Sequence, residues 1–377
     1  MTFKELLKKI LVWRLLILII AIPALLLVAP RTRFTNLSPV SSPSDLATMW
    51  SNFDGLHYLD LAQYGYGYQH KTDLDYAFFP VYPWVISKLN IFGSYLASGL
   101  FVSHLSLLLA LYFLYKLVIL DEKAGTARSV ITLILIFPTA FFFGSVYNES
   151  LFLLLTVLSF YFLRKQNFFL ACAFAGVASA TRVTGILLWP SIIYEFWLLH
   201  GKDLKKSFNT ETVWLVLPPI GLLAYMKFQL IRVGDPLFFV HIQDQFAQRT
   251  TDKVILIYQV FFRYLKMLVF VNHSDPLFFT VLLEFLSACL IVFFLIWGFK
   301  KVRFSYWFYV LASFLIPSFT GTFMSLPRFT IVLFPVFIFL AKIFEKLPKY
   351  YRIAYYTLCV IFSILSIVFF TRGYFIS

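Results

Sequence analysis

The stretch ILVWRLLILIIAIPALLLV, residues 10–28, decides the fold class of this chain. A helix of this length reaches across the hydrocarbon core of a bilayer, which is about 30 Å thick. Apolar runs of spanning length recur as far as Phe370, separated by short charged or Pro- and Gly-containing breaks. The sequence therefore predicts a polytopic, all-α membrane protein of about eleven transmembrane helices.

The composition also indicates that lipid is the main solvent of this chain. Hydrophobic residues make up 60% of the sequence, aromatic residues 20% and charged residues only 13%. A soluble domain of this size could not bury so much apolar surface. We expect residues 1–377 to form one integral membrane domain with no soluble domain appended.

The basic residues serve as topology signals in our interpretation. The net charge is +14, but the Lys and Arg residues are scattered at the ends of apolar runs, which argues against a nucleic-acid partner. With the N-terminus and its Lys4, Lys8 and Lys9 in the cytoplasm, the segment from Arg31 to Tyr76 lies outside. The later basic clusters then fall inside, around Arg128, Arg164, Lys202, Lys300 and Lys346.

The stretch from Val254 to Val271 leaves two possibilities open. It is long enough to span a membrane, yet Gln259, Arg263 and Lys266 share one helical face. An amphipathic helix lying on the outer membrane surface fits the charge rule better than a further crossing.

Under this topology the ionisable residues inside apolar sequence collect on the non-cytoplasmic side. They are Asp54, Glu149, Arg182 and Arg328, together with the loop from Arg232 to Lys253. A charge at membrane depth costs on the order of a few kcal/mol, so such groups commonly line a cavity where substrate or water compensates them. The pattern predicts a site that opens outward, with the catalytic outer loop at about residues 31–76.

Asp54, His57 and Tyr58 fall within one turn of a predicted short helix in this first outer loop. Asp54 could act on a substrate or could cap the helix N-terminus, and spacing does not separate the two roles. Glu149, beside Asn148, has the same pair of interpretations at its own helix start.

Arg182 and Arg328 interrupt apolar sequence near predicted hairpin tips. They could extend to the lipid head groups, or they could hold a lipid phosphate with two parallel hydrogen bonds. The repeated Asp-Pro-Leu-Phe-Phe at Asp235 and Asp275 is typical of a helix start, with Asp as the cap.

Several separated blocks resemble the PIG-V-like mannosyltransferases, a branch of the GT-C membrane glycosyltransferases, and the resemblance runs through most of the chain. Each block is weak alone, whereas the ordered set is specific. In chain order the blocks are NFDGLHY (52–58), QYGY (63–66), AFFPVYP (77–83), YNESLFL (147–153), ATRVTG (180–185), GDP (234–236) and PR (327–328).

The resemblance implies a GT-C-like fold, a catalytic base at Asp54, and a donor that is a polyprenyl-phosphate-linked mannose. Family members often carry Trp directly before this Asp, whereas Phe53 stands there in this chain. The acceptor would be a glycolipid or glycan. The implied location is the cell membrane, with the active site on the non-cytoplasmic side.

On this basis Asp54 would deprotonate an acceptor hydroxyl that attacks the anomeric carbon, giving inversion. Arg182 and Arg328 would neutralise the donor phosphate, and His57, Tyr58, Asn148 and Glu149 would position sugar hydroxyls. The sequence has no evident acidic metal motif, so we expect no metal and no cofactor.

Two other functions remain open at this stage. A transporter or lipid flippase also has many helices and a few intramembrane charges, but such folds favour internal repeats and sites at the bilayer midplane. An O-antigen ligase-like or polymerase-like enzyme would also use outer arginines, but its hallmark is a large outer loop late in the chain. Here the longest loop is the first.

Overall fold

The computed structural model describes residues 1–31, 45–67, 73–90, 93–203, 210–247, 249–250 and 253–376, and all regular structure among them is helical. Elements labelled η are 3-10 helices. Those up to residue 164 are α1 (Phe3–Leu27), α2 (Asp45–Thr48), η2 (Met49–Ser51), α3 (Asp54–Tyr64), η3 (Asp73–Ala77), α4 (Val81–Lys88), α5 (Tyr95–Val118), α6 (Ala124–Ile136), η4 (Ala140–Gly144) and α7 (Glu149–Arg164).

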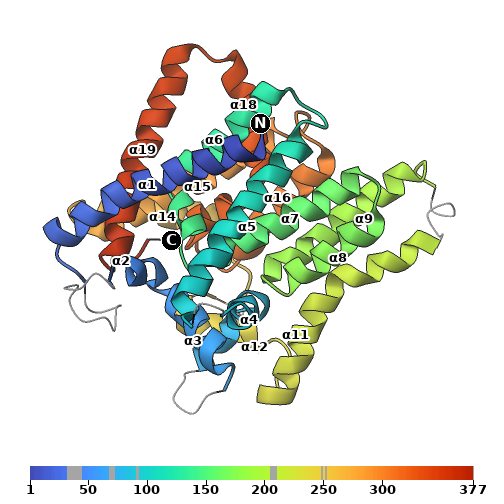
Figure 1. The fold of residues 1–377 in the computed structure, drawn as a ribbon, viewed down its shortest axis with the longest axis horizontal. Coiled ribbons are helices and arrows are strands. Elements are labelled where there is room, and N and C mark those ends of the chain that lie inside the picture. The colour runs from blue at the N-terminus through green and yellow to red at the C-terminus, as the bar shows by residue number, and fades with distance from the viewer. Residues whose placement is uncertain are drawn as a thin grey trace.

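The remaining elements complete the helical assembly that Figure 1 shows. They are α8 (Phe168–Ser179), η5 (Val183–Leu187), α9 (Leu188–Leu199), η6 (Thr210–Val216), α11 (Leu217–Val233), α12 (Phe238–His241), α13 (Gln243–Ala247), α14 (Ile257–Phe270), α15 (Pro276–Trp297), α16 (Phe304–Ser318), α17 (Leu326–Thr330), α18 (Phe334–Lys346) and α19 (Lys349–Thr371).

Five helical segments of the described chain are long and apolar enough to cross a membrane: α1, α5, η6 with α11, α15 and α19. Shorter apolar helices are α6, α8, η5 with α9, and α16. The predicted all-helical membrane fold is confirmed. The predicted number of about eleven crossings is not confirmed, because several apolar runs form helices shorter than a full span.

A complete capping box stabilises the N-terminus of helix α1. The Thr2 hydroxyl accepts a hydrogen bond from the Glu5 backbone, and the Glu5 carboxylate accepts one from the Thr2 backbone. The helix then packs beside α19 and α5, while Leu15 and Ile19 on its other face stay exposed. An apolar face of this kind is the surface that a lipid-facing helix presents.

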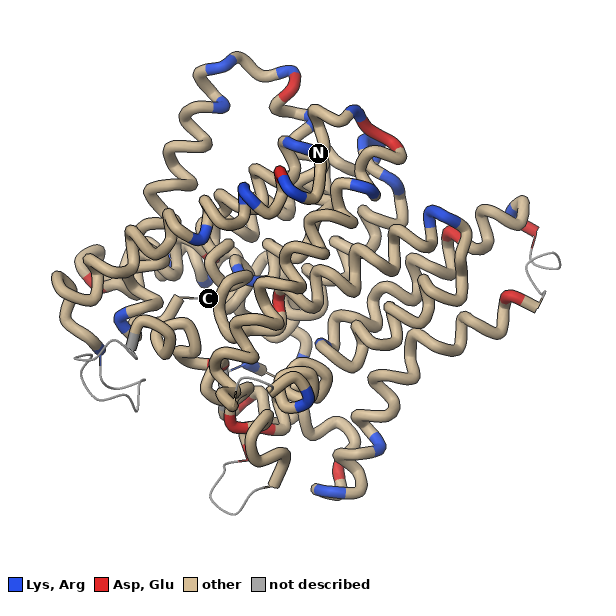
Figure 2. The backbone as a smooth tube through the Cα atoms, in the orientation of Figure 1, with Lys and Arg blue, Asp and Glu red and all other residues tan. Residues whose placement is uncertain are grey.

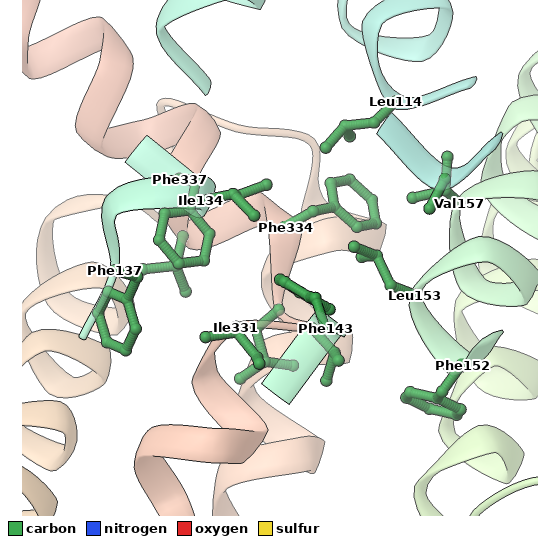
Figure 3. Close-up of a cluster of buried hydrophobic side chains, with 14 of the residues drawn as sticks. Leu114, Ile134, Phe137, Phe143, Phe152, Leu153, Val157, Ile331, Phe334 and Phe337 are labelled. Carbon is green, nitrogen blue, oxygen red and sulfur yellow. The ribbon is translucent and has the colours of Figure 1, made fainter. Parts of the chain in front are cut away.

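Helix α7 is the central helix, packed against both α5 and α8. Its sequence is apolar all round, as expected for a helix surrounded by protein. Figure 3 shows part of this core, where Leu153 and Val157 of α7 face Phe334 and Leu114 from other helices. Phe152 of α7 belongs to the same cluster. The core therefore holds the first turn of α7, and Glu149 with it, in a fixed place.

Ion pairs join several loops at one end of the molecule. Asp121 binds the guanidinium groups of Arg164 and Arg303, and Glu122 binds Lys342 at 2.6 Å. These are loops that the charge rule places together on the cytoplasmic side. Lys and Arg also gather along the upper edge of the view in Figure 2, at the end where α6 and α18 lie.

Helices α8 and α11 approach closely through small residues. A Cβ atom added at Gly221 of α11 would lie 2.0 Å from the carbonyl oxygen of Gly176 in α8. The Ser179 hydroxyl donates to the Pro218 carbonyl across the same contact. This is the small-residue packing by which membrane helices bring their backbones together.

Two sequence-based predictions concern the second half of the chain. Asp275 is the N-cap of α15, with Pro276 as the first helical residue, so the predicted cap is confirmed. At the related Asp235 the carboxylate accepts a hydrogen bond from the Leu237 backbone, but the N-cap of α12 is Leu237, so the predicted cap is wrong there. The stretch Val254–Val271 contains α14, and its relation to the membrane stays a prediction.

Candidate functional site

Asp54 is the first residue of α3, and its side chain does not cap that helix. The N-cap position is Phe53, which makes no side-chain capping bond. The Asp54 carboxylate instead accepts a hydrogen bond from Arg328, with 2.5 Å between Oδ2 and Nη1. Of the two roles considered for Asp54, the cap is therefore not the one that the side chain takes.

Arg328 lies between two carboxylates. Its Nε is 3.1 Å from Glu149 Oε1 while its Nη1 binds Asp54. Burial disfavours the charged guanidinium, but the carboxylates of Asp54 and Glu149 outweigh that effect and raise the pKa of Arg328 above its ordinary value. Arg328 therefore stays charged and ties α17 to both α3 and α7.

Glu149 shares its Oε1 between two arginines, because Arg182 Nη1 lies 2.9 Å away and Arg328 binds the same oxygen. The Glu149 side chain is only 1% exposed, so the two guanidinium groups meet it inside the protein. The other oxygen, Oε2, is buried and has no hydrogen-bond partner among the described residues. Such an acceptor can bind a substrate hydroxyl or a water molecule.

Asn148 supports this arrangement from the residue before Glu149. Its Oδ1 accepts a hydrogen bond from Arg182 Nη1 at 3.2 Å, and its Nδ2 donates to the Thr181 carbonyl at 3.1 Å. Both bonds hold the start of α7 against the segment that enters η5. The result is a continuous row of side chains, Asp54, Arg328, Glu149 and Arg182, which we call the charge row.

His57 and Tyr58 are on α3 but belong to neighbouring contacts. His57 Nδ1 lies 2.8 Å from Asp75 Oδ1, and the imidazole stacks on Phe78 with 4.8 Å between ring centroids. Tyr58 is 5% exposed and packs edge-on against Phe78 and Tyr82. Burial, and then the nearby Glu149 and Asp54, raise the pKa of Tyr58, so it remains a neutral hydroxyl.

Both ends of the Asp54–Arg328 pair follow an unusual backbone conformation. Phe53 has φ 59° and Ser325 has φ 67°, in the region that side chains of L-residues rarely adopt. A conformation of this type costs about 1–3 kcal/mol and persists where the surroundings impose it, commonly at functional sites. The fold thus holds Asp54 and Arg328 in place against a local backbone preference.

Sequence reasoning missed two polar residues around the charge row. Asp75 binds His57 although it is 2% exposed, and only its place in the first outer loop hinted at a role. Arg249 interacts electrostatically with Arg328 and Asp54. In the sequence it was only one charged residue in the predicted outer loop from Arg232 to Lys253.

A cavity of about 320 Å³ lies away from the charge row. It is bounded by α5, α16 and the residues between α15 and α16, and its lining includes Asp121, Lys301 and Arg303. None of the site residues predicted from the sequence lines it. The candidate functional site is therefore the charge row.

Comparison with solved structures shows the fold. ArnT from Cupriavidus metallidurans, in a crystal structure with undecaprenyl phosphate bound, is similar at 13% identity and a TM-score of 0.51. That alignment covers 97% of this chain and 76% of ArnT. The apo oligosaccharyltransferase of Archaeoglobus fulgidus gives 14% identity and a TM-score of 0.43, over 96% of this chain and 56% of its own.

No curated protein sequence matches this chain significantly. A family model described as Mannosyltransferase (PIG-V) matches residues 3–195, just over half of the chain. The match includes Asp54, Glu149 and Arg182, three members of the charge row, and favours a glycosyltransferase over a transporter. This chain is a membrane glycosyltransferase that belongs to the PIG-V mannosyltransferase family.

Proposed function

We propose that this enzyme transfers a mannosyl residue from a polyprenyl-phosphate-linked donor to a lipid-linked or glycan acceptor, with Asp54 as the base. One observation carries the proposal. Arg328 holds Oδ2 of Asp54, while Oδ1 accepts no hydrogen bond from the described residues. The Asp54 side chain is 18% exposed, so a substrate hydroxyl can reach that oxygen.

The reaction is a single displacement. The acceptor oxygen attacks the anomeric carbon, its proton passes to Asp54 Oδ1, and the bond from that carbon to the phosphate oxygen breaks. A transition state with oxocarbenium character and attack from the opposite face give inversion, so a β-linked donor yields an α-linked product. The departing phosphate carries the negative charge away and needs no proton.

Positive charge near the leaving phosphate speeds this step, because it stabilises charge that grows in the transition state. Arg328 and Arg182 supply it in this proposal. Both are fixed by the carboxylates, so the enzyme does not reorganise them during the reaction.

Sugar hydroxyls would be positioned by the polar groups beside the charge row. The unsatisfied Oε2 of Glu149 supports this role most directly, since it can accept a hydroxyl hydrogen bond. His57, Tyr58 and Asn148 lie on the adjoining helix starts and complete the proposed sugar contacts.

The proposed location of the site is the non-cytoplasmic face. The charge rule supports it, because the loops joined by Asp121 and Glu122 are those predicted to be cytoplasmic. The first outer loop, which carries Asp54, is predicted on the other side.

The test measures transfer of labelled mannose from polyprenyl-phosphate mannose to a lipid extract, using membranes that contain the wild type or a variant. We expect transfer by the wild type and a loss of about 10²- to 10⁴-fold in Asp54→Asn, the range that removal of a general base gives. Asp73→Asn is the matched control, since Asp73 is an exposed carboxylate of the same outer loop.

Equal transfer by the wild type and Asp54→Asn would remove Asp54 as the base. Transfer from another polyprenyl-phosphate sugar, but not from the mannose donor, would keep the reaction class and change the sugar.

A further inference from the structure

Arg249 lies in the described stretch 249–250, between α13 and α14. The backbone of its neighbour Thr250 donates to the Thr320 carbonyl at 3.0 Å, which fixes this stretch against the chain that follows α16. Arg249 Nη2 donates to the Met324 carbonyl at 3.2 Å. Because Met324 directly precedes the turn at Ser325 into α17, Arg249 is bound to the loop that carries Arg328.

Arg249 forms no ion pair with an acidic side chain among the described residues. Its two hydrogen bonds go to neutral acceptors, the Met324 carbonyl and the Gln243 side-chain oxygen at 3.3 Å. Its Nε is shielded from water and has no hydrogen-bond partner there. Arg328 and Arg182 differ, since each forms an ion pair with a buried or part-buried carboxylate.

The electrostatics place Arg249 beside the charge row. Burial lowers the pKa of Arg249 to about 10, and the nearby positive charge of Arg328 lowers it further. The negative charges of Asp54 and Glu284 raise the pKa of Arg249 and so oppose this effect. Glu284 is itself hydrogen-bonded to Tyr264 and to the Ser325 backbone. Arg249 is thus a cation at neutral pH whose charge the described residues only partly offset.

Formal charges within the charge row cancel. Asp54 and Glu149 contribute two negative charges, and Arg182 and Arg328 contribute two positive charges. A phosphate that drew Arg328 away would leave Asp54 and the buried Glu149 without their shared partner, which is costly. An incoming phosphodiester, which carries one negative charge, finds its complement in Arg249.

We propose that Arg249 is an anion-binding residue that holds the phosphate of the polyprenyl-linked donor and of the polyprenyl phosphate released from it. The identity of the ligand rests on the proposed function. A guanidinium suits this ligand because its planar N–H groups can form two parallel hydrogen bonds to phosphate oxygens. Arg328 and Arg182 keep their carboxylate partners and supply positive charge near the phosphate, while Arg249 binds the phosphate directly.

The test measures thermal unfolding of the full-length protein in detergent with a long-chain polyprenyl phosphate, or with the corresponding polyprenol as the uncharged probe. The variants are Arg249→Gln and Arg249→Lys. Arg232→Gln is the matched control, because Arg232 is an exposed arginine at the end of α11 whose guanidinium lies over the Phe228 ring.

We expect polyprenyl phosphate to stabilise the wild type and Arg232→Gln at the same concentration. Arg249→Gln should need a concentration of polyprenyl phosphate at least about tenfold higher for the same stabilisation, since it loses a charge-assisted contact. The concentration that Arg249→Lys needs should fall between those of the wild type and Arg249→Gln. Without ligand, Arg249→Gln should unfold at the wild-type temperature or above it, because it loses a partly compensated buried charge.

Stabilisation of Arg249→Gln at the wild-type concentration would overturn the proposal, as would equal stabilisation by the polyprenol. The two proposals fail separately. Arg249-dependent binding without sugar transfer would remove the proposed reaction alone. Sugar transfer by Arg249→Gln with an unchanged KM for the donor would refute the phosphate-binding role of Arg249 and leave the proposed reaction intact.

Discussion

Asp54 and Arg328 are 274 positions apart in the sequence, and their side chains meet at 2.5 Å. Arg328 also contacts Glu149, so one guanidinium connects three helices, α3, α7 and α17. The proposed base is consequently positioned by a residue from the last part of the chain.

Arg328→Gln should destabilise the protein by about 3–5 kcal/mol, because it leaves a buried carboxylate and a part-buried one without their cation. Thermal unfolding in detergent measures the change, and mannosyl transfer should fall with it. Arg328→Lys keeps the charge but cannot contact both carboxylates with one planar group, so it should recover much of the stability and less of the activity. Wild-type stability in Arg328→Gln would show that the charge row does not hold α17.

Glu149→Gln should lower stability by about 1–3 kcal/mol, since Arg182 and Arg328 would then face each other without the shared carboxylate. It should also raise the KM for the sugar donor if Oε2 binds a hydroxyl. Glu122→Gln is the control at the other end of the molecule, where the Glu122–Lys342 pair is partly exposed and contributes about 0–1 kcal/mol. Equal losses in the two variants would contradict the central place of Glu149.

Ser325→Gly should fold with unchanged or slightly higher stability, because glycine adopts the φ of 67° found at Ser325 without strain. Ser325→Val should lower stability by about 1–3 kcal/mol, since a branched side chain opposes this conformation. The same variant should reduce transfer by shifting Arg328. Unfolding curves for both variants measure the effect of this backbone conformation on stability, and a transfer assay on the same variants measures its effect on activity.

Gly221→Ala should separate α11 from α8, because its Cβ would meet the Gly176 carbonyl oxygen at 2.0 Å. Overpacking of this kind costs about 1–3 kcal/mol. Gly125→Ala is the matched control, since no atom of the described residues lies within 4 Å of its added Cβ and alanine favours the helix. Equal unfolding temperatures for the two variants would refute close packing at Gly221.

Transfer should continue in the presence of a chelator, because the proposed mechanism uses arginines in place of a metal to neutralise the phosphate. The measurement compares rates before and after EDTA treatment and after Mg²⁺ or Mn²⁺ is added back. Loss on chelation with recovery on metal addition would require a different account of the leaving group.

The sequence predicted the helical elements well, because long apolar runs and cap residues are local signals. The apolar run at residues 10–28 lies in α1 apart from its last residue, and the short helix expected at Asp54 is α3. The cap at Asp275 could also be predicted, since Asp before Pro has few other structural uses.

The partners of the charged side chains could not be predicted from one sequence. Spacing placed Asp54 and His57 on one surface, but His57 turns to Asp75 while Asp54 turns to Arg328. Arg249 carried no local signal, because what sets it apart is that its hydrogen bonds reach no carboxylate among the described residues. Such information appears only when distant segments are packed together.

The place of Arg328 in the chain has a consequence for biosynthesis. Asp54, Glu149 and Arg182 are all synthesised well before residue 328. A nascent chain that ends before Arg328 therefore lacks the cation that binds the Asp54 carboxylate. The charge row can be completed only after α17 has been synthesised.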